Sequence, residues 1–545
     1  MSFTPDSPPA ERSAAPPEFD VRHFGAVGDG VALDTGAINR AIIAAQAAGG
    51  GTVVLPAGDY LSHSIRLCSR LTLELRAGAT LIAADPPPAG GTGGYDAPEE
   101  APPNIYQDFG HSRFRNSLIW GEELDGVEIR GPGRIYGRGL SRGNGRVALP
   151  VGQVALQPPG HLPDVLEADG PVEPWDGAAL TTGPFGYPHP LDTLPSGVGN
   201  KAIALRGCRN VTVRDLTILH GGHFAILAAA CDHVTIDHVF IDTNRDGIDI
   251  DACANVRLSH CTVNSPWDDG ICVKSSCGFG GLRPVENVTI SDCYVSGFEE
   301  GTLYDGSRSR VIRHRGGPIG RIKLGTEASG GFRNIAISNC VFEFCRGLAL
   351  EQVDGAVMED VVVSHLTMRE VMNAPIFIRL GGRLRAPGAT APGTACRITI
   401  THVTASDVAP DHGIFIAGLP GHPVTDVRLA GIRLHSRGGG MAGDALRPVP
   451  EMAHDYPEPM LFGPLPAWGI YVRHAARIQL SDITLGLLGA EARPAIELDD
   501  VAAAEVAGLR LTGRASSSDW VMKDVTGLRV RDCDGLPATD REANL

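Results

Sequence analysis

Aspartate carboxylates concentrate in two short segments near the middle of this chain. The first reads Asn244-Arg-Asp246-Gly-Ile-Asp-Ile-Asp251, and the second contains the pair Asp268-Asp269. Asp268 follows Asp246 by 22 residues. Carboxylates held close together repel, so at least one of their pKa values rises. A carboxylic acid beside an ionised carboxylate is the pair that glycoside hydrolysis uses, one group protonating the leaving oxygen and the other activating water.

Two other interpretations of these aspartates are open. Aspartates next to glycine often form turns in which the carboxylate accepts backbone hydrogen bonds. A calcium cage is the second alternative, with oxygen ligands from Asp246, Asp249, Asp251, Asp268 and Asp269. Strand alternation predicts that Asp246 faces away from Asp249 and Asp251, which argues against convergence of all five.

A repeated phrase indicates which elements position these carboxylates. A polar residue is followed by alternating apolar residues, with the first two spacings at 23 and 22 residues; copies start at Asn210, His233, Asn255, Asn287 and Asn334, and weaker copies at Asp360, Arg397, Asp426 and Arg477. Alternation of period two is typical of strands with one buried face. A coil of about 22 residues that buries this face only by stacking predicts a parallel β-helix. Asp246 and Asp268 would then lie on adjacent rungs.

Three cysteines hold the same place in their phrases, namely Cys261, Cys293 and Cys340. Their apolar context favours a stacked internal row over a metal site, because no CxxC or CxxH spacing accompanies them. The 12 cysteines of the chain are expected to be mainly buried free thiols, which suits a reducing compartment.

The remaining organisation follows from caps and loops. Asp34 or Thr35 can begin a helix with apolar positions at Ile38, Ile42 and Ala45, which would plug the first coil. We expect a flexible segment over residues 1–18 and one β-helix domain over residues 19–545, with long insertions at about 86–104, 141–199, 297–320 and 436–468. Long loops on a rigid scaffold commonly build binding surfaces.

Composition narrows the class of protein. The chain has 545 residues, 69 of them Gly and 40 Pro, and its formal net charge is −16. Many short strands joined by tight turns explain the glycine and proline content. The negative charge argues against a nucleic-acid partner, and no apolar run is long enough to cross a membrane. The N-terminus lacks the apolar core of a signal peptide, so we expect a cytoplasmic location, with a periplasmic or secreted one as the alternative.

The motifs resemble those of glycoside hydrolase family 28, the polygalacturonase and pectin-hydrolase family. The segment from Asn244 to Asp249 resembles its Asn-Thr-Asp motif, with Arg245 in place of threonine, and the segment from Asp268 to Lys274 resembles its Asp-Asp motif. The coil that opens at Phe19, the Gly-Pro-Gly-Arg-Ile-Tyr-Gly run from Gly131 and the Gly-Thr-Glu stretch from Gly325 resemble further parts of the family.

This resemblance implies an all-β, right-handed parallel β-helix that cleaves α-glycosidic bonds with inversion and without a metal or other cofactor. Carried over residue by residue, Asp268 would be the general acid, and Asp246 and Asp269 would orient and deprotonate water. Asn244 and Lys274 belong to the same motifs and are candidate substrate-binding residues.

Two family motifs are absent from their expected places. Gly320 stands where a Gly-His-Gly histidine belongs, and Ala349-Leu-Glu351 stands where an Arg-Ile-Lys motif belongs. In the family those cations hold the galacturonate carboxylate, so Glu351 would favour a sugar hydroxyl. An Arg-Ile-Lys triplet one coil earlier would point Arg321 and Lys323 outward if Ile322 faces the core; a solvated strand face is the alternative.

His223 precedes the acidic coil by one rung, so it is either a further substrate ligand or a structural histidine. The predicted function is inverting hydrolysis of pectin-like, galacturonate- or rhamnose-containing carbohydrates, with the insertions at 141–199 and 297–320 favouring exo action. The alternatives are a polysaccharide lyase that uses Ca²⁺ and a base such as Arg321 or Lys323, and a non-catalytic carbohydrate-binding solenoid. The oligomeric state is open.

Overall fold

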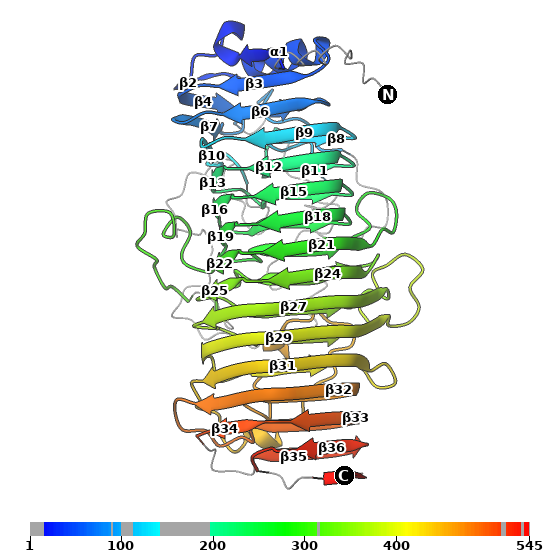
Figure 1. Cartoon of the computed structure of the whole chain (residues 1–545). Helices are drawn as coiled ribbons and strands as arrows, with labels where there is room; N and C mark the ends of the chain where they lie inside the picture. The colour runs from blue at the N-terminus through cyan, green and yellow to red at the C-terminus, as the bar shows by residue number, and fades with distance from the viewer. Residues whose placement is uncertain are drawn as a thin grey trace, which may run out of the picture.

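The repeated phrases form parallel strands that stack into a long coil. A computed structural model describes residues 16–88, 91–99, 113–141, 197–312, 317–513, 519–535 and 539–543. The chain descends from the capping helix to its C-terminus, and the strands nearest the viewer in Figure 1 run from right to left, which makes the coil right-handed. The predicted right-handed parallel β-helix is confirmed.

Three columns of strands make up the N-terminal two thirds of the coil. The first column contains β3 (Gly51–Leu55), β6 (Leu71–Leu75), β9 (Asp125–Arg130), β12 (Arg209–Arg214), β15 (Asp232–Asp237), β18 (Ala254–Ser259), β21 (Val285–Ser291) and β24 (Phe332–Ser338). The second contains β4 (Gly58–Ser62), β7 (Ala79–Ala83), β10 (Arg134–Tyr136), β13 (Thr217–Leu219), β16 (Phe240–Asp242), β19 (Thr262–Asn264), β22 (Tyr294–Ser296) and β25 (Val341–Glu343).

The third column carries the acidic motifs. It contains β5 (Ile65–Arg66), β8 (Ile119–Glu122), β11 (Lys201–Arg206), β14 (Phe224–Ala229), β17 (Asp246–Asp251), β20 (Ile271–Ser275), β23 (Ile322–Ala328), β26 (Leu348–Gln352), β28 (Ile376–Leu380) and β30 (Ile414–Ala417). Its register pairs Ile248 with Ile271 and Ile271 with Ile322. Residues of successive motifs therefore lie one above another on the outer face of this column.

Longer strands continue the coil toward its C-terminal end, where the first two columns merge and, from β32 on, the third column joins them. They are β27 (Val357–Arg369), β29 (Thr394–Val408), β31 (Val424–Ser436), β32 (Ile470–Leu487) and β33 (Ile496–Ala507). The short elements of the two ends and the loops are β1 (Glu18–Asp20), η1 (Val21–Phe24), β2 (Asp29–Leu33), η3 (Asp444–Leu446), η4 (Pro459–Phe462), β34 (Arg510–Thr512), β35 (Trp520–Thr526), β36 (Leu528–Arg531) and β37 (Thr539–Ala543).

The first residue of each phrase has a specific structural task. Asn210, Asn255, Asn287 and Asn334 have φ between 53° and 59°, in the left-handed region that asparagine tolerates better than most residues. The side chains of Asn255, Asn287 and Asn334 form a ladder, since the amide of Asn287 donates to Asn255 at 3.1 Å and that of Asn334 donates to Asn287 at 2.8 Å. These turns fix the 22- to 23-residue coil length that sets the rung register.

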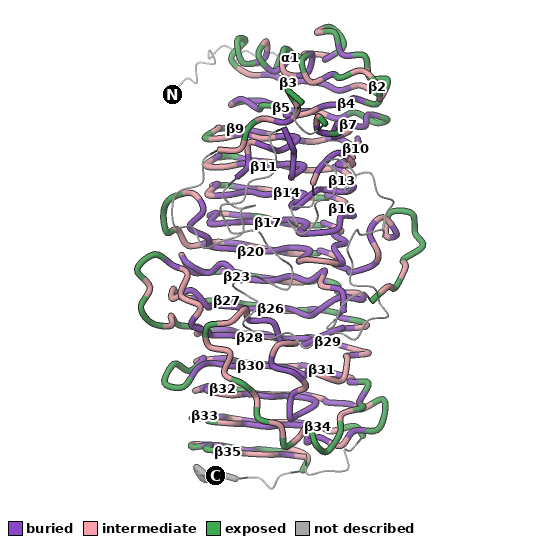
Figure 2. The backbone as a smooth tube through the Cα atoms, turned by 180° about the vertical axis from the view of Figure 1, so that it is seen from behind, coloured by how far each residue is buried: buried purple, intermediate pink, exposed green. Residues whose placement is uncertain are grey.

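The core is a continuous apolar column inside the coil. Figure 2 shows buried backbone along the strands and exposed backbone mainly in the protruding loops. The predicted row of Cys261, Cys293 and Cys340 is buried in this core on successive rungs. All 12 cysteines are free thiols, ten of them buried, as predicted from their apolar context.

Helix α1 (Thr35–Ala47) covers the N-terminal end of the core. Its residues Ile38, Ile42 and Ala45 are buried against that core, as the apolar spacing predicts. Asp34 takes the N-cap position, but its carboxylate accepts hydrogen bonds from the backbone of Val27 and Gly28. The prediction that the helix begins at Asp34 or Thr35 is confirmed, but the Asp34 side chain makes no capping hydrogen bond because a neighbouring turn uses both of its oxygens.

The predicted insertions differ in how much of them the structure describes. Residues 142–196, the main part of the insertion at 141–199, lie outside the described residues, as do 1–15 of the N-terminal segment, 89–90 and 100–112 around the first loop, and 313–316 of the third. The insertion at 436–468 is fully described and contains η3 and η4. None of the described helices is long and apolar enough to cross a membrane.

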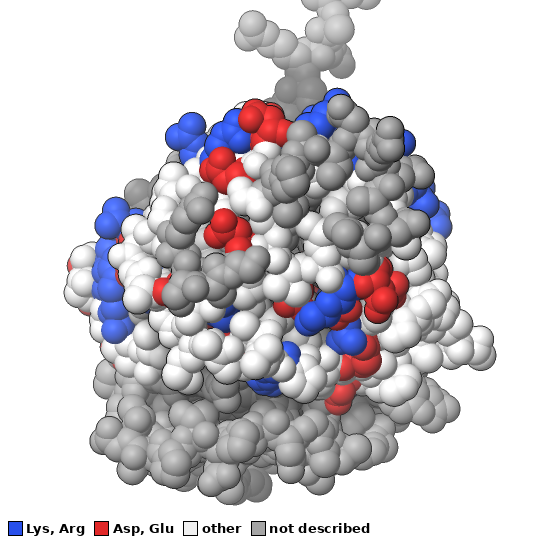
Figure 3. All heavy atoms as spheres, turned by 90° about the horizontal axis from the view of Figure 1, so that it is seen from below, with Lys and Arg blue, Asp and Glu red and all other residues white. Residues whose placement is uncertain are grey.

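The C-terminal end of the molecule carries no surface of a single sign among its described residues. Seen from the C-terminal end, acidic and basic side chains lie beside one another among uncharged residues (Figure 3).

A surface cavity of about 700 Å³ lies over the first and second columns, lined among others by Arg214, His238, Phe240 and His260. None of the lining residues comes from the acidic motifs, so this cavity is separate from the candidate site.

Candidate active site

The acidic motifs meet at the start of β17 and β20, where the backbones of adjacent rungs are hydrogen-bonded. The amide of Gly247 donates to the carbonyl of Asp269 at 3.0 Å, and that of Gly270 donates to the carbonyl of Arg321 at 2.9 Å. These bonds place Asp246, Asp269 and Arg321 on three consecutive rungs. The prediction that the 22-residue spacing brings the two motifs to one edge is confirmed.

Asp246 and Asp269 lie close together beside a cysteine. Carboxylate oxygens of these residues and the thiol of Cys272 lie within 4.8 Å of one another, and all three residues are buried. Two carboxylates at this separation can both bond to a single water molecule, since each such bond spans about 2.5–3.0 Å. The arrangement is suited to holding and deprotonating water.

A divalent ion fits this group poorly, because ammonium groups already supply the positive charge. Lys323 Nζ lies 3.3 Å from Asp269 Oδ2, and Lys274 Nζ lies 3.8 Å from Asp246 Oδ1. The five-aspartate calcium cage is likewise unsupported, because Asp251 accepts hydrogen bonds from Ser276 instead.

One expectation about the direction of the side chains is wrong. Asp246 and Asp249 both face outward, since Lys274 Nζ lies 3.8 Å from the first and 3.1 Å from the second. Strand alternation fails here because the strand begins irregularly at Gly247. A Cβ on this glycine would lie 2.3 Å from Val263 in the core, so Gly247 and Ile248 both face inward.

The electrostatic environments of the aspartates differ strongly. Burial raises the pKa of Asp246 well above its usual value, and the nearby charge of Asp268 raises it further. Burial also acts to raise the pKa of Asp269, but Lys323 and Arg321 outweigh it and hold that pKa below its usual value. Asp246 therefore favours the protonated form and Asp269 the ionised form, the separation that acid–base pairs in active sites require.

Asp268 occupies the outermost position of the three aspartates. Its side chain is 22% exposed, and Arg245 Nη2 donates to its Oδ2 at 2.7 Å. Arg245 stands at the position where the sequence departs from the Asn-Thr-Asp motif. Arg245 therefore places a positive charge directly beside the candidate general acid Asp268. The motif comparison did not predict this contact.

Arg321 and Lys323 point outward from β23, as predicted, because Ile322 and Leu324 pack in the core. They are not a solvated face: both are 1% exposed. Arg321 Nε donates to Asp269 at 2.8 Å, and Lys323 lies 3.6 Å from Glu351 on the next rung.

Glu351 is fully buried at the position where the family carries a cation. Its carboxylate accepts a hydrogen bond from Thr326 Oγ1 at 3.2 Å, and burial raises its pKa to about 7 against the opposing effect of Lys323 and Arg321. Gly320, where the family histidine belongs, has no room for a side chain, because a Cβ would lie 2.2 Å from the carbonyl of Ser296.

Two further residues predicted to bind substrate are His223, one rung before the aspartates, and Asn244, beside them. His223 is fully buried and its ring contacts that of Phe224 at 4.4 Å between centroids. Asn244 is also buried, and its carbonyl accepts from the amide of Trp267 at 3.1 Å. Both sit next to the carboxylates, but neither lies open to solvent in this structure.

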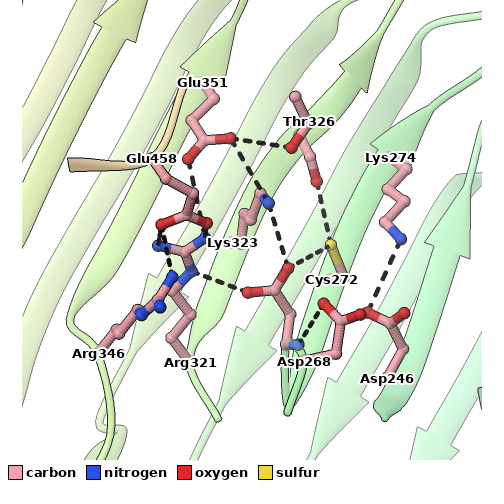
Figure 4. A network of polar contacts seen from close by, with 12 residues as sticks. Asp246, Asp268, Cys272, Lys274, Arg321, Lys323, Thr326, Arg346, Glu351 and Glu458 are labelled. Atoms are coloured by element: carbon pink, nitrogen blue, oxygen red, sulfur yellow. Dashed lines mark hydrogen bonds and ion pairs between the residues drawn. The ribbon is translucent and has the colours of Figure 1, made fainter. Parts of the chain in front are cut away.

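A strap from the last insertion covers this network. We define the strap as residues 449–463. Glu458 of the strap accepts from Arg346 at 2.7 Å and pairs with Arg321, and Tyr456 accepts from Lys323 at 3.1 Å. Figure 4 shows Glu458 between the two guanidinium groups, with Lys323 and Glu351 beside them.

Apolar contacts seat the strap on the third column. Phe462 packs against Phe415 with 5.0 Å between ring centroids, and Phe377 lies beside them. Arg379 donates to the backbone of Glu451 at 2.6 Å.

Comparisons with known proteins agree with this architecture. Residues 196–281 match the family model described as right handed beta helix region, and residues 19–74 match the one described as rhamnogalacturonase A/epimerase, pectate lyase-like. An exo-poly-alpha-D-galacturonosidase of Dickeya chrysanthemi is 27% identical over 280 residues, which cover 47% of this chain and 41% of that protein. These matches support a relationship of the chain to glycoside hydrolase family 28-like proteins.

Solved structures share the fold of this family 28-like chain. The family 28 exopolygalacturonase of Yersinia enterocolitica aligns with a TM-score of 0.60 at 20% identity, covering 96% of this chain and 80% of that one. The exopolygalacturonase of Thermotoga maritima aligns with a TM-score of 0.56 at 20% identity, covering 78% and 89%. A mannuronan C5-epimerase of Azotobacter vinelandii is 65% identical, but over 43 residues, 8% of this chain and 3% of the epimerase. The curated relatives are thus matched over less than half of their length.

The motif comparison did not identify three residues of the site, namely Arg346, Tyr456 and Glu458. Glu458 is separated from Arg346 by 112 residues and from Arg321 by 137. Arg346 was visible as the start of the Arg-Gly-Leu run before Glu351, and its position next to the expected cation motif was the available signal. Nothing in the local sequence of the strap indicated its partners.

Proposed function

We propose that this chain is an inverting glycoside hydrolase that cleaves α-glycosidic bonds in pectin-like carbohydrates containing galacturonate or rhamnose. The observation that carries the proposal is the opposite displacement of two pKa values, raised at Asp246 and lowered at Asp269, for carboxylates whose oxygens lie within 4.8 Å. The kinship with polygalacturonase-type glycosidases supports the substrate class.

In this mechanism Asp268, the most exposed of the three aspartates, delivers a proton to the leaving glycosidic oxygen. Asp269 stays ionised through Arg321 and Lys323. Together with Asp246 it orients a water molecule and accepts its proton as the water attacks the anomeric carbon.

The buried ion pairs argue against a lyase mechanism. A lyase base must be free to take a proton from the sugar, whereas Arg321 pairs with Asp269 and Glu458, and Lys323 with Asp269 and Glu351.

Product analysis tests the proposal. Oligogalacturonides and rhamnogalacturonan oligosaccharides are incubated with the protein. Proton NMR identifies the anomer that forms first, and ultraviolet absorbance detects unsaturated sugars. Inversion predicts that an α-linked substrate first releases the β-anomer. An α-anomer formed first, or an unsaturated product, would contradict the mechanism.

A further inference from the structure

The carboxylate of Glu458 lies where two arginines converge. Arg346 Nη1 donates to Oε2 at 2.7 Å and Arg321 Nη1 donates to the same oxygen at 3.3 Å, while Arg321 Nη2 pairs with Oε1. Paired guanidinium groups of this kind are the usual recognition element for a planar carboxylate. Here the carboxylate comes from the chain itself.

The strap holds this carboxylate firmly in place. Glu458 is 6% exposed, and η4 begins at the next residue. Phe462 of η4 is fully buried against Phe415 on the third column. Burial acts to raise the pKa of Glu458, but Arg321, Arg346 and Lys323 keep it below its usual value. Glu458 therefore remains an anion that satisfies both arginines.

The cations of the described site are already paired with carboxylates of the chain. Its cations are Lys274, Arg321, Lys323 and Arg346, and the carboxylates that pair with them are Asp246, Asp249, Asp269, Glu351 and Glu458. A further carboxylate brought in by a sugar would enter a buried region whose cations are already paired. Burying a charge without a partner is strongly unfavourable.

We propose that Glu458 is a specificity-determining residue: it takes the place of a uronate carboxylate against Arg321 and Arg346, so that the sugar bound beside Asp269 is neutral. This inference rests on the proposed hydrolase function and narrows its substrate. The acidic sugars of a pectin-like chain then lie outside this position, and a neutral sugar such as rhamnose or galactose occupies it.

Two sugars that differ only at C6 test this inference. Binding of D-galactose, which has a hydroxymethyl group there, and of D-galacturonate, which has a carboxylate, is measured by isothermal titration calorimetry on the wild-type chain. Hydrolysis of the corresponding 4-nitrophenyl α-glycosides is measured in parallel. We expect the wild type to favour the neutral sugar by about tenfold or more in Kd and in kcat/KM.

The variant Glu458→Gln keeps the shape of the side chain and removes its charge. It should shift the preference toward the uronate by at least about tenfold, because Arg321 and Arg346 then lose the carboxylate of Glu458. Glu451→Gln is the matched control: Glu451 lies on the same strap but pairs with Arg473 and His474, so its substitution should leave the preference unchanged.

The wild-type measurement decides the inference even if Glu458→Gln fails to fold. Tighter binding of D-galacturonate than of D-galactose by the wild type would overturn it, as would an unchanged preference in a folded Glu458→Gln variant. Failure to hydrolyse either glycoside would count against the proposed hydrolase instead, while the binding comparison would still decide the role of Glu458.

Discussion

Arg245 Nη2 donates a hydrogen bond to Asp268 Oδ2 at 2.7 Å, between the turns that precede two adjacent rungs. The arginine side chain is 9% exposed and the aspartate 22%, so the pair is partly shielded from solvent. Asp268 also raises the pKa of the fully buried Asp246. Arg245 thus orients the carboxylate of Asp268, the residue whose charge acts on Asp246.

The first prediction follows from this contact. Arg245→Thr removes the hydrogen bond that orients the Asp268 carboxylate, so kcat/KM should fall by about tenfold or more, as measured on the best substrate from the product screen. Arg245→Lys keeps the charge and serves as the control. Equal kcat/KM values for the wild type and Arg245→Thr would show that this contact does not position Asp268.

The second prediction concerns the proton donor itself. Asp268→Asn leaves the side-chain shape but cannot deliver a proton, so kcat should fall by about 10²–10⁴-fold. Asp237→Asn is the control, because Asp237 lies on β15 and bonds Ser259 and His260 rather than the site. Full activity of Asp268→Asn on a substrate that the wild type cleaves would refute its assignment.

The third prediction is a pH effect on stability. Asp242 is fully buried, and its carboxylate accepts from the amides of Gly301 and Tyr304, both at 2.8 Å, so it anchors the insertion at 297–320. Burial raises its pKa from 3.8 to about 6, and Glu300 adds to the rise. Because the folded state binds this proton more tightly, the associated stability is complete below about pH 4 and is lost as pH rises through 6.

Asp242→Asn should abolish this contribution, which is on the order of 3 kcal/mol between pH 4 and pH 7. Chemical unfolding of the wild type and the variant at both pH values measures it, since the difference between them isolates the one carboxylate. Asp305→Asn is the control, because Asp305 is an exposed carboxylate of the same insertion that bonds Ser307. A wild-type decline that persists in Asp242→Asn would contradict the prediction.

Regular features of the fold could be predicted because each rung repeats the same local physics. The asparagine that opens a phrase adopts a left-handed turn, and the alternating residues after it fill the same core positions, as Cys261, Cys293 and Cys340 do. The 22-residue separation of Asp246 and Asp268 therefore translated directly into adjacent rungs. Irregular positions could not be predicted in this way. At Gly247 the alternation breaks, so Asp246 faces outward rather than inward.

Contacts made by insertions could not be predicted in the same way. Arg321 and Lys323 were expected to face outward, and they do, but their partners Glu458 and Tyr456 come from a strap without periodicity. The position of such a segment depends on which surface of the coil its apolar residues pack against. Phe462 contacts Phe415 because the third column carries outward-facing aromatic side chains on its lower rungs. No local pattern in the strap indicates this contact.

The fourth prediction therefore concerns the seating of the strap. Phe462 is fully buried between Phe415 and Phe377, and a buried Phe→Ala substitution costs about 3–5 kcal/mol. Phe462→Ala should release the strap from the third column while the coil beneath it stays folded. Hydrogen exchange in residues 449–463 should then increase by at least about 100-fold, with little change in β17 and β20. Leu446→Ala is the control, because Leu446 is 87% exposed on the same insertion. If exchange in the strap stayed at the wild-type rate in Phe462→Ala, the polar contacts of Glu458 and Tyr456 alone would be sufficient to hold the strap, and the apolar seat would not be what positions it.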